Sequence, residues 1–489
     1  MSYERADLAA LPFEAVRRLP SVSAEAAWQI SAGHLGLAAG TVTFRAAEVA
    51  RRSLASLTCA QSSNYASAMA HRSVKVAIFG INYAPEPTGI APYTTGLAKG
   101  LAERGHDVQV LTGYPHYPQW RRADGGSGFR SEEVLDGVRV RRFSHHVPRQ
   151  LSWVGRAAME MTFGLQLLTS RWGRPEVIVC VTPPLLAAVS VIGRARLTVR
   201  RPAVGILVQD LYSRGVAETA VASGLAAHAV SVAEAAATRL ADGVAVIHAG
   251  FTPHLSERLG VDVRRVREIR NWTHVNAPDP LASVAFRRER GWGADEIVIL
   301  HAGNMGYKQG LENVVAAAEL AARANSKARF VLLGDGNQRL SLEAIAASVP
   351  TLEFVPPVSD EDFPSALGAA DVLLVNERPG VAQMAVPSKL TSYFSSGKPI
   401  VAATDTAGFA AGELAASGAG VCVPADRPDL LLSEAVRIGT DHALGARMGD
   451  AGRSYCTTVL SGEAALDRYE EWIIDLANGR RSGCRPGSN

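Results

Sequence analysis

The sequence predicts an α/β protein that contains two doubly wound parallel sheets in tandem. Short apolar runs alternate with helical segments, and this alternation occurs twice along the chain. Strands of a parallel sheet are buried on both faces, so they read as continuous apolar runs, and the helices between them form right-handed crossovers. Glycine-containing loops follow several of these runs, at the carboxyl ends of strands where such sheets bind ligands.

The bulk composition excludes several other classes of protein. The chain has 489 residues, 47% hydrophobic and 20% charged, with a net charge of +3. This length suits two or three globular domains, and so small a net charge gives no reason to expect a nucleic-acid partner. No apolar run reaches the length of a membrane span. The five cysteines lack the paired spacing of a zinc site or a disulfide framework, so we expect neither, and free thiols in a chain of this length suggest a reducing cytoplasm.

The first sheet is predicted in residues 74–270. Its apolar strand segments are 74–80, 108–112, 138–143, 177–181, 204–208 and 243–247. Helices are expected over 91–104, over 151–172 and after Pro183–Pro184. Residues 1–73, rich in Ala, Ser and Arg, are predicted to be a poorly ordered extension. Either a misassigned start before Met69 or a genuine accessory helix pair accounts for them.

The second sheet is predicted in residues 271–460. A break in the pattern near residues 271–280 marks the boundary between the two domains. The strand segments of the second half are 297–301, 329–334, 352–355, 372–375, 399–403 and 421–424, with helices over 311–323, 340–348 and 390–396. Residues 461–489 are expected to form an amphipathic helix, over 463–476, and a flexible tail. If the two sheets face each other, the loops after their strands line a shared cleft.

Two loops in the second half have the residues that a diphosphate requires. The first contains Gly303, Asn304, Gly306 and Lys308 between a strand and a helix; glycines expose backbone N–H groups, and lysine supplies a positive charge. A glycine-rich turn with a solvated lysine is the alternative. The second places Ser388 and Lys389 at a helix start, where the helix dipole favours anions.

Three further residues are candidates for contact with the donor or the acceptor, and each of them also has a purely structural interpretation. Glu377 is placed to accept hydrogen bonds from ribose hydroxyls, or is simply a surface carboxylate. Gly334 ends a strand and either lies near the donor or only shapes a turn. Asp210 ends an apolar strand, where it would orient an acceptor hydroxyl or the donor sugar, or cap a helix.

The loop before the first long helix carries Thr88, Gly89 and Ile90. Gly89 allows the backbone to approach a ligand, and the helix N-terminus that follows favours anions. An ordinary turn between a strand and a helix is the alternative. The loop does not contain Gly-x-Gly-x-x-Gly, so a dinucleotide-dependent dehydrogenase loses its main support.

Three groups of residues together resemble the retaining glycosyltransferases with two Rossmann-like domains (the GT-B fold, group 1 or family 4). The resemblance is to their bacterial exopolysaccharide branch, typified by the colanic acid fucosyltransferase, and it covers about residues 74–472. The first group is the opening loop, Gly80-Ile-Asn-Tyr-Ala-Pro-Glu-Pro-Thr-Gly-Ile90, and the second is the loop after the second strand, Tyr114-Pro-His116-Tyr-Pro-Gln-Trp120. The third group consists of the two donor-side loops, Gly303-Asn304 with Lys308-Gln-Gly-Leu311, and Pro387-Ser-Lys-Leu390.

This resemblance implies transfer of a sugar from a nucleoside diphosphate donor with retention of anomeric configuration. Lys308 and a neighbouring cation, Lys389 or Arg378, would stabilise the leaving diphosphate in place of a metal. The acceptor would be a saccharide, typically lipid-linked at the cytoplasmic face of the membrane, and His116 would contact it or a phosphate together with Thr88, Gly89 and Ile90. The stretch from Arg121 to Arg201, with 14 arginines, no lysine and 6 acids, suits peripheral membrane contact, although a solvated surface is an equal alternative.

The chain departs from the wider family at the donor site. The family's Glu-x7-Glu pair aligns with Gln383 and Thr391, which are not acidic, and Asn304 stands where an arginine is common. Recognition of the ribose and the sugar must therefore differ. Two alternatives to a transferase are considered. A nucleotide-sugar epimerase of the same fold would need acid and base carboxylates around the sugar, so the missing Glu-x7-Glu pair argues against it. The departures at Asn304, Gln383 and Thr391 leave open a non-catalytic subunit that binds a nucleotide-sugar.

Overall fold

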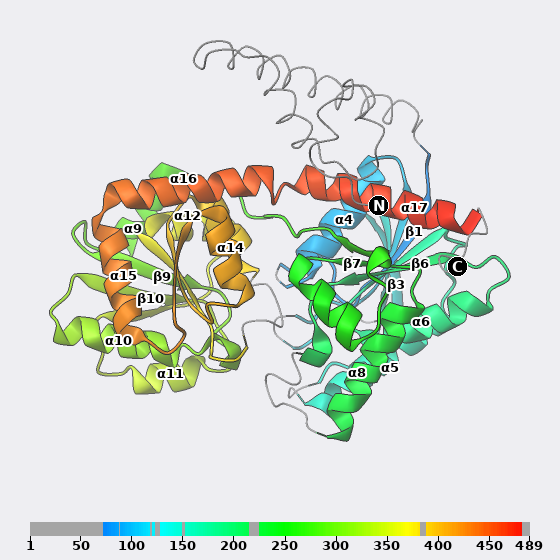
Figure 1. Cartoon of the computed structure of the whole chain (residues 1–489), viewed down its shortest axis with the longest axis horizontal. Coiled ribbons are helices and arrows are strands. Elements are labelled where there is room, and N and C mark those ends of the chain that lie inside the picture. The colour runs from blue at the N-terminus through cyan, green and yellow to red at the C-terminus, as the bar shows by residue number, and fades with distance from the viewer. Residues whose placement is uncertain are drawn as a thin grey trace, which may run out of the picture. The chain divides into compact units, whose positions relative to one another are not determined.

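The computed structural model of the chain confirms the predicted fold class, with two α/β domains that each contain a largely parallel sheet (Figure 1). The structure describes residues 72–87, 89–117, 120–122, 128–148, 152–214, 224–381 and 388–481. The prediction for the N-terminal extension therefore lies outside the described residues, apart from its last two positions.

The first sheet has eight strands among the described residues, in the order β3-β4-β2-β1-β5-β6-β7-β8. The strands are β1 (Lys75–Phe79), β2 (Asp107–Gly113), β3 (Arg130–Leu135), β4 (Val138–Phe143), β5 (Val177–Val181), β6 (Ala203–Val208), β7 (Gly243–Val246) and β8 (Val266–Glu268). All neighbours are parallel except β3 and β4. The order reverses between β1 and β5, so ligand-binding loops are expected at that end of the sheet.

Helices cover both faces of the first sheet. On one face α5 (Trp153–Thr169) packs on α6 (Leu185–Leu197), which packs on α8 (Leu225–Leu240). The other face holds α4 (Ala91–Glu103) and α17 (Gly462–Arg481), which pack on each other (Figure 1). Two strands of this sheet, β3 and β8, were not predicted. Most side chains of β3 face solvent, and β8 is only three residues long, so neither produces an apolar run.

In the described part of the second domain, the sheet has six parallel strands in the order β11-β10-β9-β12-β13-β14. They are β9 (Ile297–Ala302), β10 (Ala328–Leu333), β11 (Leu352–Val355), β12 (Val372–Asn376), β13 (Ile400–Ala403) and β14 (Gly420–Val423). Its helices are α9 (Pro280–Glu289), α10 (Glu312–Arg323), α11 (Arg339–Ile345), α12 (Phe363–Ala369), α13 (Lys389–Ser396), α14 (Phe409–Ser417), α15 (Pro428–Thr440) and α16 (His442–Thr458). The order again reverses between neighbours, here β9 and β12, and the loops that follow these two strands carry the predicted diphosphate residues.

Sequence patterns missed α8, α9, α12, α14, α15 and α16, and α16 shows why. Its glycines lower helix propensity, yet they allow close packing: a Cβ added at Gly449 would lie 1.9 Å from the carbonyl oxygen of Gly397. Tertiary contact rather than local propensity therefore fixes this helix.

The last helix, α17, returns to the first domain. Trp472 fits against β6 and β7 because both strands carry a glycine at the contact. A Cβ at Gly205 or Gly243 would lie within 2.5 Å or 2.9 Å of the Trp472 ring. The predicted C-terminal segment is thus part of the first domain's packing.

Within the described residues, none of the helices combines the length and the apolar character that crossing a membrane requires.

Candidate active site

The loop after β9 is shaped by backbone hydrogen bonds. The N–H of Gly303 donates to the carbonyl of Leu333 at 2.8 Å, and the N–H of Gly306 donates to Oε1 of Gln309 at 3.1 Å. The expectation that both N–H groups face a diphosphate is corrected by these bonds, because each is already used within the protein. Gly303 is needed instead for its φ of 121°, which strongly favours glycine.

Gly334 brings the loop after β10 against the loop after β9. A Cβ at Gly334 would lie 2.0 Å from the carbonyl oxygen of Gly303, and its φ is 136°. Gly334 therefore acts by permitting this close backbone approach. Asn304 and Lys308 are exposed in the same region, so their side chains are accessible to a ligand.

The loop after β12 is tied to the loop after β9. Asn376 donates through Nδ2 to the carbonyls of Gln309 (2.7 Å) and Gly310 (2.9 Å), and the N–H of Arg378 donates to the carbonyl of Lys308 at 2.8 Å. The guanidinium of Arg378 stacks on Tyr307 and pairs with Glu312 at 3.0 Å. Its charge is thus already countered, which favours Lys389 over Arg378 as the second cation.

Lys389 begins α13 and contacts a buried histidine. Its Nζ lies 3.1 Å from Nε2 of His301, whose side chain is fully buried. Burial lowers the pKa of His301 well below its usual value, and the charge of Lys389 acts in the same direction. The imidazole is therefore neutral. Burial also lowers the pKa of Lys389 to about 7, against the opposing effect of Glu377. The charge of Lys389 therefore depends on what binds beside it.

The other residues predicted around α13 differ in accessibility. Ser388 is exposed, whereas Thr391 is 7% exposed and donates its hydroxyl to the carbonyl of Ser388 at 2.8 Å. Glu377 is half-buried and accepts a hydrogen bond from Thr404 Oγ1 at 2.5 Å. Ser388 and Thr391 line a pocket that Tyr93 of α4 and Asn271 of the interdomain segment also line. Gln383 lies outside the described residues.

Asp210 follows β6 in the first domain. Burial raises its pKa, while the charges of Lys308 and Arg156 lower it. Tyr117 lies in the same field, since the charges of Asp210 and Arg156 both act on the pKa of its phenol. The charge of Lys308, in the second domain, thus acts on the carboxyl of Asp210 in the first domain. Sequence reasoning missed Arg156 and Tyr117, because nothing in the linear pattern places them beside Asp210.

His116 holds its loop together and does not present its ring to a ligand. His116 is 3% exposed, and its backbone N–H donates to Oε1 of the buried Glu86 at 2.7 Å. Glu86 also accepts the N–H of Tyr117 at 2.9 Å. The prediction that His116 contacts the acceptor or a phosphate is corrected by this burial. Gly89, with a φ of 70°, lies under the Tyr117 ring, and the half-buried Ile90 precedes α4. Thr88 lies outside the described residues.

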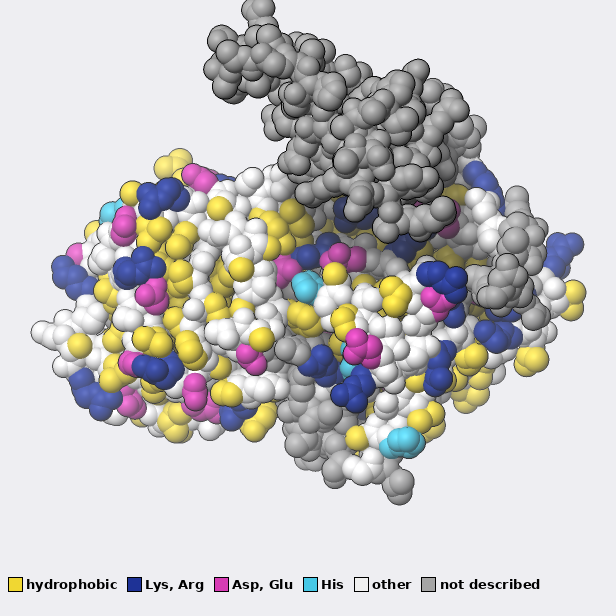
Figure 2. Space-filling view, viewed as in Figure 1, with side chains coloured by type: hydrophobic (Ala, Val, Ile, Leu, Met, Phe, Trp, Pro, Cys, Tyr) yellow, Lys and Arg dark blue, Asp and Glu magenta, His cyan; other side chains and the backbone are white. Residues whose placement is uncertain are grey.

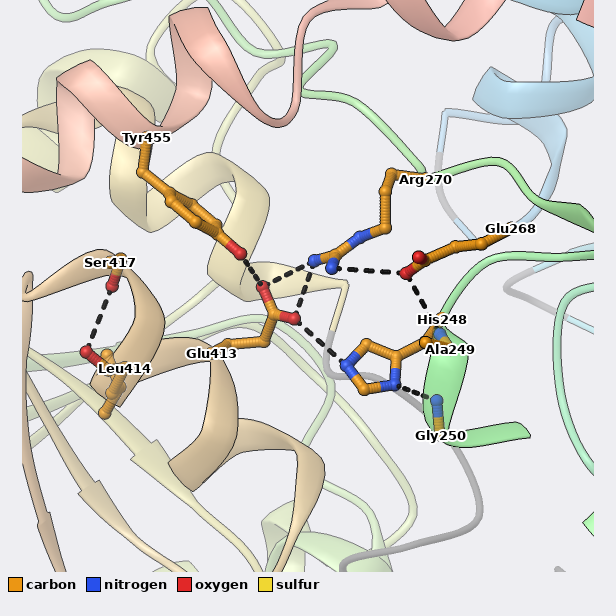
Figure 3. A network of polar contacts seen from close by, with 9 residues as sticks. All are labelled: His248, Ala249, Gly250, Glu268, Arg270, Glu413, Leu414, Ser417 and Tyr455. Carbon is orange, nitrogen blue, oxygen red and sulfur yellow. Dashed lines mark hydrogen bonds and ion pairs between the residues drawn. The ribbon is translucent and has the colours of Figure 1, made fainter. Parts of the chain in front are cut away.

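A polar network joins the two domains around Glu413 of α14 (Figure 3). Arg270, just after β8, contacts both carboxylate oxygens at 2.6 Å, His248 Nε2 lies 3.2 Å from Oε1, and the Tyr455 hydroxyl donates to Oε2 at 3.2 Å. The Glu413 side chain is 4% exposed and that of Arg270 is 14% exposed. Burial alone would raise the pKa of Glu413, but His248 and Arg270 lower it below its usual value.

Arg270→Ala is expected to destabilise the protein by about 3 kcal/mol, because it leaves a buried carboxylate without its main partner. The free energy of unfolding of the wild-type protein should also fall at acid pH. A carboxyl whose pKa is lowered by folding contributes stability above its unfolded pKa and loses it as pH falls through the folded pKa. For Glu413 this window lies below about pH 4.3, the usual pKa of a glutamate. Denaturant unfolding at neutral and acid pH measures both effects.

The control is Arg267→Ala. Arg267 pairs with Asp475, but the two side chains are 45% and 54% exposed, so removal should cost about 1 kcal/mol or less. Equal losses of stability in the two variants would contradict the role assigned to the buried network.

Among the residues that the structure describes, no group of three or more His, Cys, Asp or Glu side chains is arranged to hold a metal ion.

Comparison with known proteins gives the family. Residues 88–272 match the family described as "Glycosyl transferase 4-like domain", and residues 296–441 match "Glycosyl transferases group 1". The chain is 30% identical over 336 residues to the "Putative colanic acid biosynthesis glycosyl transferase WcaI" of Escherichia coli (strain K12), covering 66% of this chain and 82% of that protein.

Solved structures with low sequence identity share the fold. Sucrose-phosphate synthase of Thermosynechococcus elongatus superposes with a TM-score of 0.66 at 18% identity, over 83% of this chain and 100% of that one. Anabaena Alr3699/HepE in complex with UDP-glucose gives 0.61 at 16% identity, over 82% and 100%. By sequence and by fold, this chain belongs to the group 1 glycosyltransferases of glycan biosynthesis, with the GT-B architecture of two Rossmann-like domains.

Proposed function

We propose that this glycosyltransferase moves a sugar from a nucleoside diphosphate donor to a lipid-linked saccharide, with retention of anomeric configuration, in the synthesis of an exopolysaccharide or another surface glycan. The observation that carries the proposal is the joined pair of loops after β9 and β12. They present Lys308, Ser388 and Lys389 on one side of the second sheet, at its switch point.

The diphosphate leaving group determines which residues matter. As the bond to the sugar breaks, negative charge develops on the diphosphate, and fixed positive groups stabilise that charge. Lys308 is exposed, whereas Lys389 is held against His301 at 3.1 Å. The α13 N-terminus at Ser388 adds the positive end of a helix dipole. In this proposal the protein cations take the place that a divalent metal has in other transferases.

The first domain supplies the acceptor side. Asp210 would accept a hydrogen bond from the acceptor hydroxyl or from the donor sugar, in the field of Lys308 and Arg156. The acceptor attacks from the face that the diphosphate leaves, and a diphosphate oxygen takes the acceptor's proton. No nucleophile from the protein is needed. Support for a nucleotide-sugar donor comes from the neighbour HepE, which was solved with UDP-glucose.

A panel of uridine and guanosine diphosphate sugars tests donor use. A donor that binds the folded state raises the unfolding temperature, so at least one member of the panel should do so. Incubation with that donor alone, followed by proton NMR, should leave the sugar's configuration unchanged. An epimer formed without an acceptor would contradict the proposal and identify an epimerase.

A further inference from the structure

Helix α5 has an apolar stripe on its outer surface. Val154, Met161, Leu165 and Leu168 are 55%, 57%, 60% and 37% exposed. Their spacing of seven, four and three residues places them on one face of the helix. The opposite face is also apolar, since Phe163 is buried against the domain core. A helix that is apolar on both faces is normally covered on both.

The turn after α6 continues this stripe. Leu197 and Val199 are 87% and 102% exposed, among the most exposed large hydrophobic side chains in the described part of the chain. The turn lies beside the end of α5, because Arg194 donates to the carbonyls of Leu167 and Leu168 at 3.0 Å and 2.7 Å. The two segments therefore form one surface, here called the α5–α6 face.

The α5–α6 face is basic as well as apolar. From residue 152 to residue 201 the sequence holds seven arginines and two glutamates. Neither glutamate is exposed: Glu160 is buried, and the half-buried Glu176 accepts the N–H of Lys75. Arg196 and Arg200 are exposed on either side of the apolar pair in the turn. Figure 2 shows hydrophobic and basic side chains beside one another on the part of the first domain where Figure 1 shows α6.

We propose that the α5–α6 face docks on an anionic lipid surface. Leu197, Val199 and the α5 stripe would enter the boundary between headgroups and acyl chains, while the arginines contact lipid phosphates. The charge of the face favours this partner. Residues 152–201 have four exposed arginines and no exposed acid, so the apolar surface and its positive charge complement an anionic lipid; these arginines are Arg171, Arg174, Arg196 and Arg200. Single apolar side chains on a protein surface need no explanation, but these are contiguous.

This surface is connected to the site. Arg156 belongs to the first turns of α5, and its charge acts on the pKa of Asp210. The same helix thus faces the bilayer on its outer side and reaches the proposed acceptor site at its beginning. The inference rests on the proposed function for the lipid-linked nature of the acceptor, because such an acceptor reaches the enzyme from the membrane surface.

Co-sedimentation of the full chain with vesicles tests the docking. Vesicles of phosphatidylcholine alone are compared with an equal mixture of phosphatidylcholine and phosphatidylglycerol, at low and high salt. We expect binding to the mixed vesicles that weakens with salt. The double variant Leu197→Glu/Val199→Glu should weaken this binding by about tenfold or more, since two apolar side chains no longer enter the lipid.

The matched control is Leu281→Glu/Leu340→Glu, on α9 and α11 of the second domain, where the wild-type side chains are 80% and 82% exposed. It makes the same change of charge and should bind like wild type. Equal weakening in both double variants, or no binding of the wild type, would overturn the docking. So would a wild-type dimer that only Leu197→Glu/Val199→Glu dissociates, which would make the face an interface between copies.

Transfer to a detergent-solubilised acceptor separates this inference from the proposed function. Leu197→Glu/Val199→Glu should keep wild-type turnover in detergent, because both residues precede the amino end of β6, at the edge of the first sheet opposite the loops that follow its strands. The vesicle assay contains no nucleotide-sugar, so its failure would leave the proposed transfer standing.

Discussion

Replacing Lys308 with alanine should lower kcat about 10²- to 10³-fold, because the leaving diphosphate then loses one of its two lysine partners. The fold should be unaffected, since the side chain is exposed and the carbonyl that receives the Arg378 N–H remains. Steady-state kinetics with the best donor, together with a thermal unfolding curve, measure both parts. A loss in kcat/KM similar to the loss in kcat would place the lost interaction in the transition state.

Lys327→Ala is the control for Lys308→Ala. Lys327 is another lysine of the second domain, 67% exposed and paired with Asp295 at 3.0 Å. Its replacement removes the same charge from the domain without touching the diphosphate loops, so turnover should match wild type. Wild-type turnover in Lys308→Ala, or an equal loss in both variants, would contradict the role given to Lys308.

Donor affinity should fall as pH rises above about 7, and the reason is Lys389. Burial lowers the pKa of its amine to about 7, so in the free enzyme it is largely neutral above that pH. A bound diphosphate favours the charged ammonium and raises that pKa again. Binding therefore takes up a proton in this range, and affinity should decrease by up to about tenfold per pH unit.

Calorimetry in buffers of different ionisation enthalpy measures that proton uptake directly. Lys389→Met keeps the length of the side chain but cannot be protonated. It should bind the donor more weakly near pH 7 and show no uptake through this position, whereas Lys327→Ala should behave like wild type. Wild-type affinity that stays constant from about pH 7 to pH 9 would show that Lys389 does not carry the charge next to the diphosphate.

Buried strands were predictable from the sequence because each one is a continuous apolar run. β5 and β9, for example, have no exposed residue and were found at nearly their observed bounds. The edge strand β3 was not found because nearly all its residues face solvent. The packing of α17 on the first domain was not predicted either. It depends on the contact of Trp472 with Gly205 and Gly243, which are far away in the sequence.

The candidate site was predictable only where a single loop contains it. Lys308 and Ser388–Lys389 follow strands, so position and residue type point to them. The contact of Lys389 with His301 joins residues 88 positions apart, and no local pattern shows it. Burial of one side chain and hydrogen bonds of two backbone N–H groups changed two other interpretations. His116 is an internal support of its loop, and the N–H groups of Gly303 and Gly306 bond within the protein.

The central claim is sugar transfer from a nucleoside diphosphate donor with retention, and one measurement tests it most directly. The wild-type chain is incubated with the isotope-labelled donor from the binding panel and a bacterial lipid extract, and proton NMR determines the anomeric configuration of the labelled product. We predict one labelled glycolipid with the donor's configuration, and nucleoside diphosphate released in equal amount. An inverted product, or no labelled lipid with any donor that binds, would contradict the account.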